Sequence, residues 1–223
     1  MGIPVYFKTL INNYQNDILT DKKLNNIDYL FLDLNCLIHP CCRELTCEKT
    51  MINNIINNIN KLIDYTGVNK LIFIAIDGIA PLAKMKQQKQ RRYIKSLQSK
   101  YIKNQSWNTN SISPGTIFMN KLNISLKNYY KNYKIKCILS DSNERGEGEH
   151  KIIHYIKNNN INNNICIYGL DSDLIMLSLS LHIDNIYLLR ERTEYNLENT
   201  KSEYIYLLII KLKLYLLKSL FTK

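Results

Sequence analysis

Residues 137–157 read CILSDSNERGEGEHKIIHYIK, and residues 165–177 read ICIYGLDSDLIML. Each stretch starts with a short apolar run that is typical of a buried strand, and each run is followed by two carboxylates spaced i, i+2. The four acids are Glu147, Glu149, Asp171 and Asp173. Because carboxylates that are packed together repel one another, four of them where a parallel sheet would end predict a bound cation, and a divalent metal is the obvious candidate.

The rest of the chain alternates between apolar strand-like runs and helix-like segments. Strands are expected at residues 29–34, 71–76, 136–139, 165–168 and 185–189, and helices at 48–65, 84–103, 114–133, 149–157, 174–181 and 204–221. This alternation predicts an α/β fold with a mostly parallel central sheet flanked by helices, within one domain over residues 1–223. Three lysines interrupt the apolar segment 204–221, so we expect a core or interface helix there and no membrane span.

Two further acids lie at the ends of expected strands. Asp33 lies near the end of the run at 29–34, and Asp77 directly follows the run at 71–76. Ligands of parallel sheets bind at the carboxyl ends of the strands, so all six acids are expected to form a metal site at one edge. The alternative for single residues, such as Asp171 or Asp173, is a role as a helix N-cap.

Basic residues outnumber acidic ones by 30 to 19, which gives a formal net charge of +11. This balance favours a polyanionic partner such as nucleic acid, although a coding bias toward lysine would produce the same excess. Within the expected helix 84–103, four residues fall on one face and can converge on one anion: Lys84, Gln88, Arg91 and Arg92. The alternative is an ordinary solvated basic helix.

The N-terminus and the cysteines bear on the compartment. The opening sequence MGIPVYFKTL has neither the apolar core nor the cleavage site of a signal peptide, so we expect an intracellular protein, with the cytoplasm favoured over the nucleus. The six cysteines are then expected to be reduced thiols. A zinc site is the alternative for a cluster without paired C-x-x-C motifs: Cys36, His39, Cys41, Cys42 and Cys47.

Six motifs make the chain similar to the N-terminal region of the XRN family of 5′→3′ exoribonucleases. In chain order they are MGIPVYF at 1–7, LDLNCLIHP at 32–40, AIDGIAPLAKMKQQKQRR at 75–92, SPGTIFM at 113–119, GEGEHK at 146–151 and YGLDSDLIML at 168–177. The resemblance implies a PIN/FEN-like nuclease fold. It also implies Mg²⁺, with Mn²⁺ as a substitute, and a 5′→3′ exoribonuclease activity on single-stranded RNA that carries a 5′-monophosphate.

The resemblance also assigns roles to individual residues. The family's catalytic, metal-binding acids fall on Asp33, Asp77, Glu147, Glu149, Asp171 and Asp173, and its 5′-phosphate pocket falls on Lys84, Gln88, Arg91 and Arg92. His39 matches a histidine that stacks on the leading bases of the substrate. We expect His150 to orient the loop that bears the two glutamates, and Lys151 to start the following helix.

The chain departs from the family pattern in three ways. Arg145 stands where the family usually has proline, and Leu82 stands where it often has a basic residue. Family members are also much longer, so we expect an incomplete nuclease domain whose apolar tail, residues 204–223, packs under a missing C-terminal region or a partner chain. The alternatives are a non-catalytic remnant that binds 5′-phosphorylated RNA or a protein, and a flap-type structure-specific nuclease.

Overall fold

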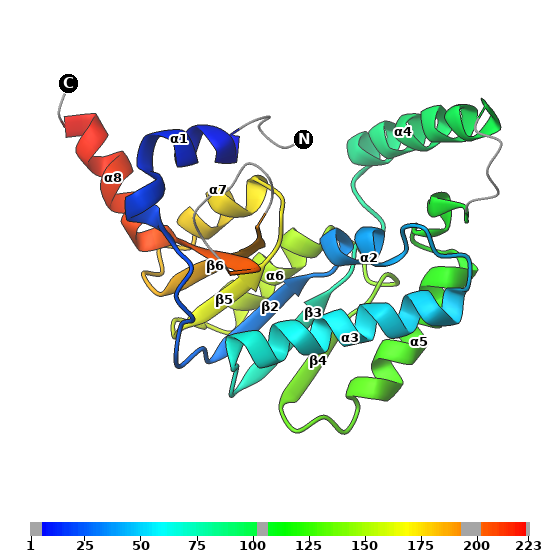
Figure 1. Ribbon diagram of the computed structural model, residues 1–223, viewed down its shortest axis with the longest axis horizontal. Helices are drawn as coiled ribbons and strands as arrows, with labels where there is room; N and C mark the ends of the chain where they lie inside the picture. Colours follow the sequence, from blue (N-terminus) through cyan, green and yellow to red (C-terminus); the bar gives the residue numbers. More distant parts are fainter. Residues whose placement is uncertain (1–5, 102–106, 193–201, 222–223) are drawn as a thin grey trace.

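The computed structural model describes residues 6–101, 107–192 and 202–221 (Figure 1). Within this part of the chain, seven strands form one sheet in the order β1-β7-β6-β5-β2-β3-β4. The strands are β1 (Leu19–Thr20), β2 (Tyr29–Asp33), β3 (Leu71–Ala75), β4 (Lys136–Ser140), β5 (Ile165–Tyr168), β6 (Ile186–Glu191) and β7 (Tyr204–Leu208). The strands from β6 to β4 are parallel, whereas β7 pairs antiparallel with β6 and β1. The predicted α/β class with a mostly parallel sheet is confirmed.

Apolar side chains alternate across the central strands, so each strand contributes to both faces of the sheet. In β2, Leu30 and Leu32 pack on one face and Phe31 packs on the other. The first face is covered by α3 (Glu48–Thr66) and α5 (Ile117–Tyr130). The second is covered by α1 (Tyr6–Ile18), α6 (Gly148–Asn158), α7 (Asp173–Leu179) and α8 (Ile209–Phe221) (Figure 1). Burying one large apolar side chain contributes about 1.5–3 kcal/mol, so these two layers fix the sheet.

Two helices follow strand ends at the carboxyl edge of the sheet. The short α2 (Asn35–Cys41) comes directly after β2. The long α4 (Leu82–Tyr101) follows β3 and stands away from the two helical layers (Figure 1). The chain then forms a short 3₁₀ turn, η1 (Thr109–Ser111), before α5. The helix expected at 84–103 is therefore present as α4, and its polar composition agrees with its exposed position.

The prediction of one helix over residues 204–221 is wrong. Tyr204–Leu208 form strand β7, and α8 begins only at Ile209. The physical reason is that YIYLL is a continuous apolar run, which suits a strand buried on both faces, and that it pairs antiparallel with β6. The lysines that interrupt the segment begin only at Lys211. Among the described residues, every helix falls short of the length and apolar character that a membrane span requires.

Two smaller differences concern the start of the chain and the start of α5. The sequence patterns did not predict α1 or β1. Helix α5 begins at Ile117 and not at Pro114, because the Thr116 hydroxyl accepts a hydrogen bond from the Met119 N–H at 3.4 Å and caps the helix there.

Candidate active site

The carboxyl edge of the sheet brings the six predicted acids into one region. Asp33 is the last residue of β2, and Asp77 follows β3 by two residues. Glu147 and Glu149 flank the first residue of α6, while Asp171 and Asp173 lie between β5 and the start of α7. The chain continues from β2 to β3 on one side and from β5 to β6 on the other, so the strand order reverses between the neighbouring strands β2 and β5, and this is where parallel sheets bind ligands.

Three of the acids form a compact group of possible metal ligands. One carboxylate oxygen from each of Glu149, Asp171 and Asp173 lies within 4.8 Å of the other two. Asp33 packs beside them, and the start of α6 is so close that a Cβ on Gly148 would lie 2.6 Å from Asp33 Oδ1 and 3.4 Å from Asp77 Oδ1. The acids of four chain segments therefore face a common space.

The electrostatics of this group favour a bound cation. Burial, together with the charges of Asp77, Glu149 and Asp171, raises the pKa of Asp33 well above its ordinary value. Burial and then the neighbouring carboxylates also raise the pKa of Glu149, to about 7. Asp33 Oδ1 and Glu149 Oε2 are buried without a hydrogen-bond donor among the described residues. Buried carboxylate oxygens without donors fit a hard divalent cation.

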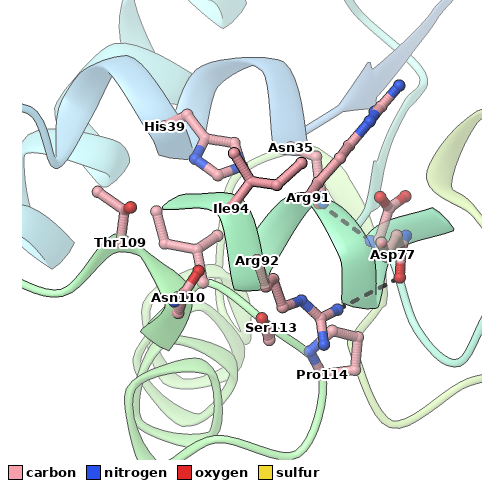
Figure 2. A pocket seen from close by; sticks show the side chains of 12 residues that line it. Asn35, His39, Asp77, Arg91, Arg92, Ile94, Thr109, Asn110, Ser113 and Pro114 are labelled. Atoms are coloured by element: carbon pink, nitrogen blue, oxygen red, sulfur yellow. Dashed lines mark hydrogen bonds between the residues drawn. The ribbon is translucent and has the colours of Figure 1, made fainter. Parts of the chain in front are cut away.

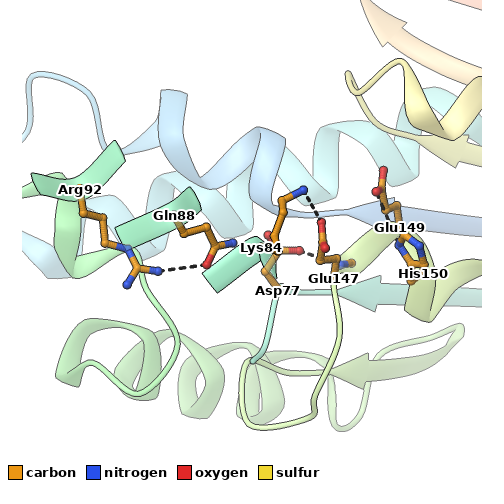
Figure 3. Close-up of polar contacts among 8 residues, drawn as sticks. Asp77, Lys84, Gln88, Arg92, Glu147, Glu149 and His150 are labelled. Carbon is orange, nitrogen blue, oxygen red and sulfur yellow. Dashed lines mark hydrogen bonds and ion pairs between the residues drawn. The ribbon is translucent and has the colours of Figure 1, made fainter. Parts of the chain in front are cut away.

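The other two acids have protein partners (Figure 3). Glu147 Oε2 accepts a hydrogen bond from Lys84 Nζ at 2.7 Å. Burial opposes the charge on Lys84, but the contact with Glu147 outweighs it and raises the lysine pKa. Asp77 Oδ1 accepts from the Gly148 N–H at 2.6 Å, so Asp77 stabilises the start of α6. The capping role considered for Asp171 and Asp173 is not seen in α7, whose N-cap residue is Ser172.

Three of the four predicted phosphate-binding residues line a cavity of about 410 Å³, which we call the inner pocket (Figure 2). Gln88, Arg91 and Arg92 of α4 face residues 109–114 across it. His39 of α2 and Asp77 complete the wall. Arg92 Nη2 donates to Gln88 Oε1 at 3.3 Å, which holds the guanidinium toward the pocket.

Lys84 is the one predicted phosphate ligand that does not line the inner pocket. Its ammonium group is instead paired with Glu147 (Figure 3). Lys84 therefore lies between the acids and the inner pocket, and it links α4 to the loop before α6. The phosphate-binding role of the whole group stays a prediction.

Backbone hydrogen bonds fasten the two loops that carry Asp77 and Glu147. Gly78 N–H donates to Gly146 O at 2.8 Å, and Gly146 N–H donates to Ile79 O at 2.9 Å. The loops approach so closely that a Cβ on Gly78 would lie 1.7 Å from Glu144 O. Only glycine permits this contact, because a side chain at this position would collide with the backbone.

Lys151 and His150 differ in how far they support this arrangement. Lys151 lies inside α6 and does not start it; its Nζ donates to Ile76 O at 2.7 Å and to Asp141 O at 2.8 Å, joining the ends of β3 and β4 to the helix. His150 is exposed, with its Nδ1 3.6 Å from Glu149 Oε1. The orienting role of His150 stays a prediction.

Arg190 is a residue of this region that the sequence patterns did not identify. It is buried near the end of β6, and its guanidinium donates to the backbone carbonyls of Leu170 and Asp171. It also lies over the ring of Phe7, with Cζ 4.1 Å from the ring centroid, which joins α1 to the loop that bears Asp171. The sequence does mark this position, because Arg190 follows an apolar strand-like run, as several of the acids do.

The cysteines do not form the alternative zinc site within the described part of the chain. All six are free, and the one group of possible metal ligands found there is Glu149, Asp171 and Asp173. Cys41 and Cys42 are buried in the apolar layer around α3. Burial raises the pKa of the Cys41 thiol to about 11, so it stays protonated at neutral pH.

The mostly parallel sheet flanked by helices has the PIN/FEN-like nuclease fold. The catalytic core of Rad2 in complex with a DNA substrate has this fold: its TM-score is 0.51 at 12% sequence identity, covering 90% of this chain and 52% of that one. The family can be stated more narrowly. The chain belongs to the family described as XRN 5′-3′ exonuclease N-terminus, whose model matches residues 1–192.

Individual relatives agree with this assignment. The chain is 30% identical to 5′-3′ exoribonuclease 2 of Eremothecium gossypii over 86% of its own length and 27% of that protein. It is 34% identical to 5′-3′ exoribonuclease 1 of Saccharomyces cerevisiae over 91% of its length and 16% of that protein. The chain therefore spans about a quarter or less of the length of these relatives.

Proposed function

We propose that this chain carries the metal-binding part of a Mg²⁺-dependent 5′→3′ exoribonuclease that acts on single-stranded RNA with a 5′-monophosphate. The position of Asp77 supports this most directly, because Asp77 adjoins the acid group and also lines the inner pocket with Arg91 and Arg92. A terminal phosphate held in that pocket would direct the next phosphodiester toward the acids. Distance from the 5′ end would then select the bond that is cut.

The acids and the pocket would have separate tasks in this reaction. Asp33, Glu149, Asp171 and Asp173 offer the oxygen atoms that would hold the cation. Mg²⁺ bound there supplies charge neutralisation and activates water for phosphodiester hydrolysis. Arg91 and Arg92 would bind the terminal phosphate through their forked donors. His39 offers a ring on which the first base can stack.

Two hydrogen bonds within the chain hold Glu147 and Asp77 in position. Lys84 holds Glu147, and Asn35 Oδ1 accepts a hydrogen bond from the Asp77 N–H at 3.0 Å, fixing the loop at the end of β3. Neither contact involves Arg91 or Arg92. Loss of the arginines should therefore change the choice of RNA end and leave the acid group intact.

The double substitution Arg91→Ala/Arg92→Ala is expected to remove the preference for a 5′-phosphate. The rate on 5′-phosphorylated RNA should fall at least about tenfold, toward the rate on 5′-hydroxyl RNA, since each charge-assisted hydrogen bond contributes about 1.5–3 kcal/mol. Mg²⁺ binding should not change. Cleavage of both RNAs is followed on gels, and Mg²⁺ binding is followed by the shift in melting temperature.

Lys86→Ala/Lys89→Ala is the matched control, because it removes two exposed positive charges from the same helix outside the inner pocket. This double substitution should weaken RNA binding only by reducing the long-range electrostatic attraction between α4 and RNA, and it should keep the preference for a 5′-phosphate. An undiminished preference in Arg91→Ala/Arg92→Ala would contradict the role given to the inner pocket.

A second candidate function is binding of 5′-phosphorylated RNA without cleavage, because Gln88, Arg91 and Arg92 line the inner pocket and none of them belongs to the group of acids that could hold a metal. Binding of 5′-phosphorylated RNA without any shortening in Mg²⁺ would support this candidate. A preference for branched DNA over RNA would instead indicate a flap-type nuclease.

A further inference from the structure

A second cavity, of about 590 Å³, lies beside the loops that carry Asp77 and Glu147. We call it the outer pocket, and the residues that matter for its chemistry are Ile79, Pro81, Arg145, His150, Lys151 and His154. It shares no lining residue with the inner pocket. It adjoins the acids directly, because His150 Nδ1 lies 3.6 Å from Glu149 Oε1.

The outer pocket combines cationic and apolar groups. Its charged lining residues, Arg145 and Lys151, are both basic. Arg145 is exposed and forms no hydrogen bond or ion pair with any described residue, so its guanidinium is available to an anion. Ile79, which is 62% exposed, and Pro81 supply an apolar surface. Beside this apolar surface, the imidazole rings of His150 and His154 can stack on an unstacked base while Arg145 binds its phosphate.

The pocket is built on a rigid base. The hydrogen bonds between Gly78 and Gly146, and between Gly146 and Ile79, tie its two loops together. Lys151 fixes the third side through its bonds to the ends of β3 and β4. The cavity is therefore preformed, which lowers the entropic cost of binding.

The order of the side chains across the site indicates which part of an RNA reaches the outer pocket. Figure 3 shows Arg92, Gln88, Lys84, the acids and His150 in sequence across the site, so His150 lies at the end away from the inner pocket. An RNA whose 5′-phosphate lies against Arg92 would pass the acids and continue toward His150. Its later nucleotides would then meet the outer pocket.

We propose that the outer pocket binds the RNA on the 3′ side of the scissile phosphate, holding one unstacked base and its phosphate. This inference rests on the proposed function, because the direction of the RNA comes from the 5′-phosphate in the inner pocket. The two pockets hold the strand on both sides of the acids. Only RNA long enough to reach both pockets gains the second contact.

The test compares oligouridylates with a 5′-phosphate that contain two or six nucleotides, bound in EDTA so that no cleavage occurs. Arg145→Gln/His154→Gln should weaken binding of the six-nucleotide RNA about tenfold, as expected for the loss of one stacked base and one phosphate contact. The dependence of its log affinity on log salt should become shallower by about 0.7. Binding of the dinucleotide should not change.

Lys157→Gln, which removes a cation from α6 outside the outer pocket, is the control and should preserve the affinity difference between the two RNAs. Equal binding of the six-nucleotide RNA by the wild-type chain and by Arg145→Gln/His154→Gln would overturn the proposal. Adenosine 5′-monophosphate tests the alternative occupant, a released mononucleotide, which also carries one base and one phosphate. If its binding is lost in Arg145→Gln/His154→Gln, the pocket holds the released product and the assignment to the 3′ strand is wrong.

The two proposals can fail separately. In Arg91→Ala/Arg92→Ala, the 5′-phosphate preference should disappear, while the six-nucleotide RNA should still lose affinity when Arg145 and His154 are also replaced. A lasting 5′-phosphate preference would refute the inner pocket alone. A missing effect of Arg145 and His154 in both backgrounds would refute the outer pocket alone.

Discussion

Glu149→Gln is expected to reduce Mg²⁺-dependent cleavage by about a thousandfold and, at the same time, to stabilise the metal-free chain at pH 8. The loss of activity follows from removing a carboxylate of the ligand group, because a bound metal contributes several kcal/mol of transition-state stabilisation and each 1.36 kcal/mol is tenfold in rate. The gain in stability follows from removing a buried charge that lacks a donor on Oε2.

The pKa of Glu149 explains why the substitution should stabilise the metal-free chain at pH 8. The pKa of Glu149 is about 7 in the folded chain, against an ordinary value of 4.5, so the folded state holds the proton more tightly than the unfolded state. The contribution of this group to stability is therefore complete below about pH 4.5 and is lost as the pH rises through about 7. The loss amounts to about 3 kcal/mol at pH 8 and should be absent in Glu149→Gln.

Thermal unfolding in EDTA and in Mg²⁺, at pH 5 and pH 8, measures both effects beside a cleavage assay. Glu48→Gln is the matched control, because Glu48 lies in the first turn of α3 and pairs with Lys121 at 2.7 Å on the surface. It should change stability by less than about 1 kcal/mol and leave cleavage unaltered. Full activity in Glu149→Gln, or no gain in the stability of the metal-free chain at pH 8, would contradict a metal site that includes Glu149.

Gly148→Ala is expected to weaken Mg²⁺ binding by about 10- to 100-fold, the range seen when residues that orient metal ligands are changed. The new Cβ would lie 2.6 Å from Asp33 Oδ1, and the buried Asp33 side chain has little room to move. Alanine itself suits a helix better than glycine, so the fold should persist. Cleavage should then recover partly at high Mg²⁺, which separates a displaced ligand from an unfolded chain.

The apparent Mg²⁺ affinity, from the rise in melting temperature and from the cleavage rate, measures this change. Gly67→Ala is the control: its Cβ meets no atom within 4 Å, but its φ of 62° is unfavourable for alanine. It should cost about 1 kcal/mol of stability and leave the Mg²⁺ affinity unchanged. Unaltered Mg²⁺ affinity in Gly148→Ala would mean that the close approach of α6 to Asp33 does not shape the site.

The placement of the acids could be predicted because it depends on local patterns. Asp33 and Asp77 each follow an apolar run, and the strand-helix alternation puts the ends of such runs at one edge of a parallel sheet. The partner of Lys84 could not be predicted in this way. Its position on α4 placed it with Gln88 and Arg91, but Glu147, 63 residues further along the chain, comes within hydrogen-bond distance only after α6 packs on the sheet.

The remaining differences come from patterns that fit two structures equally well. The run Tyr204–Leu208 is apolar at every position, so neither helical nor strand periodicity is visible, and pairing with β6 decides the outcome. Arg190 also follows an apolar run, but its role depends on the tertiary contact of its guanidinium with the carbonyls of Leu170 and Asp171.

Strand β7 also matters for anyone who shortens this chain. The family match ends at residue 192, and a fragment cut there would lack the strand that pairs with β6. The backbone N–H and C=O groups along that side of β6 would become an open edge, and open edges recruit strands from other molecules. A fragment that keeps residues 202–221 avoids this route to aggregation and is the better starting point for biochemistry.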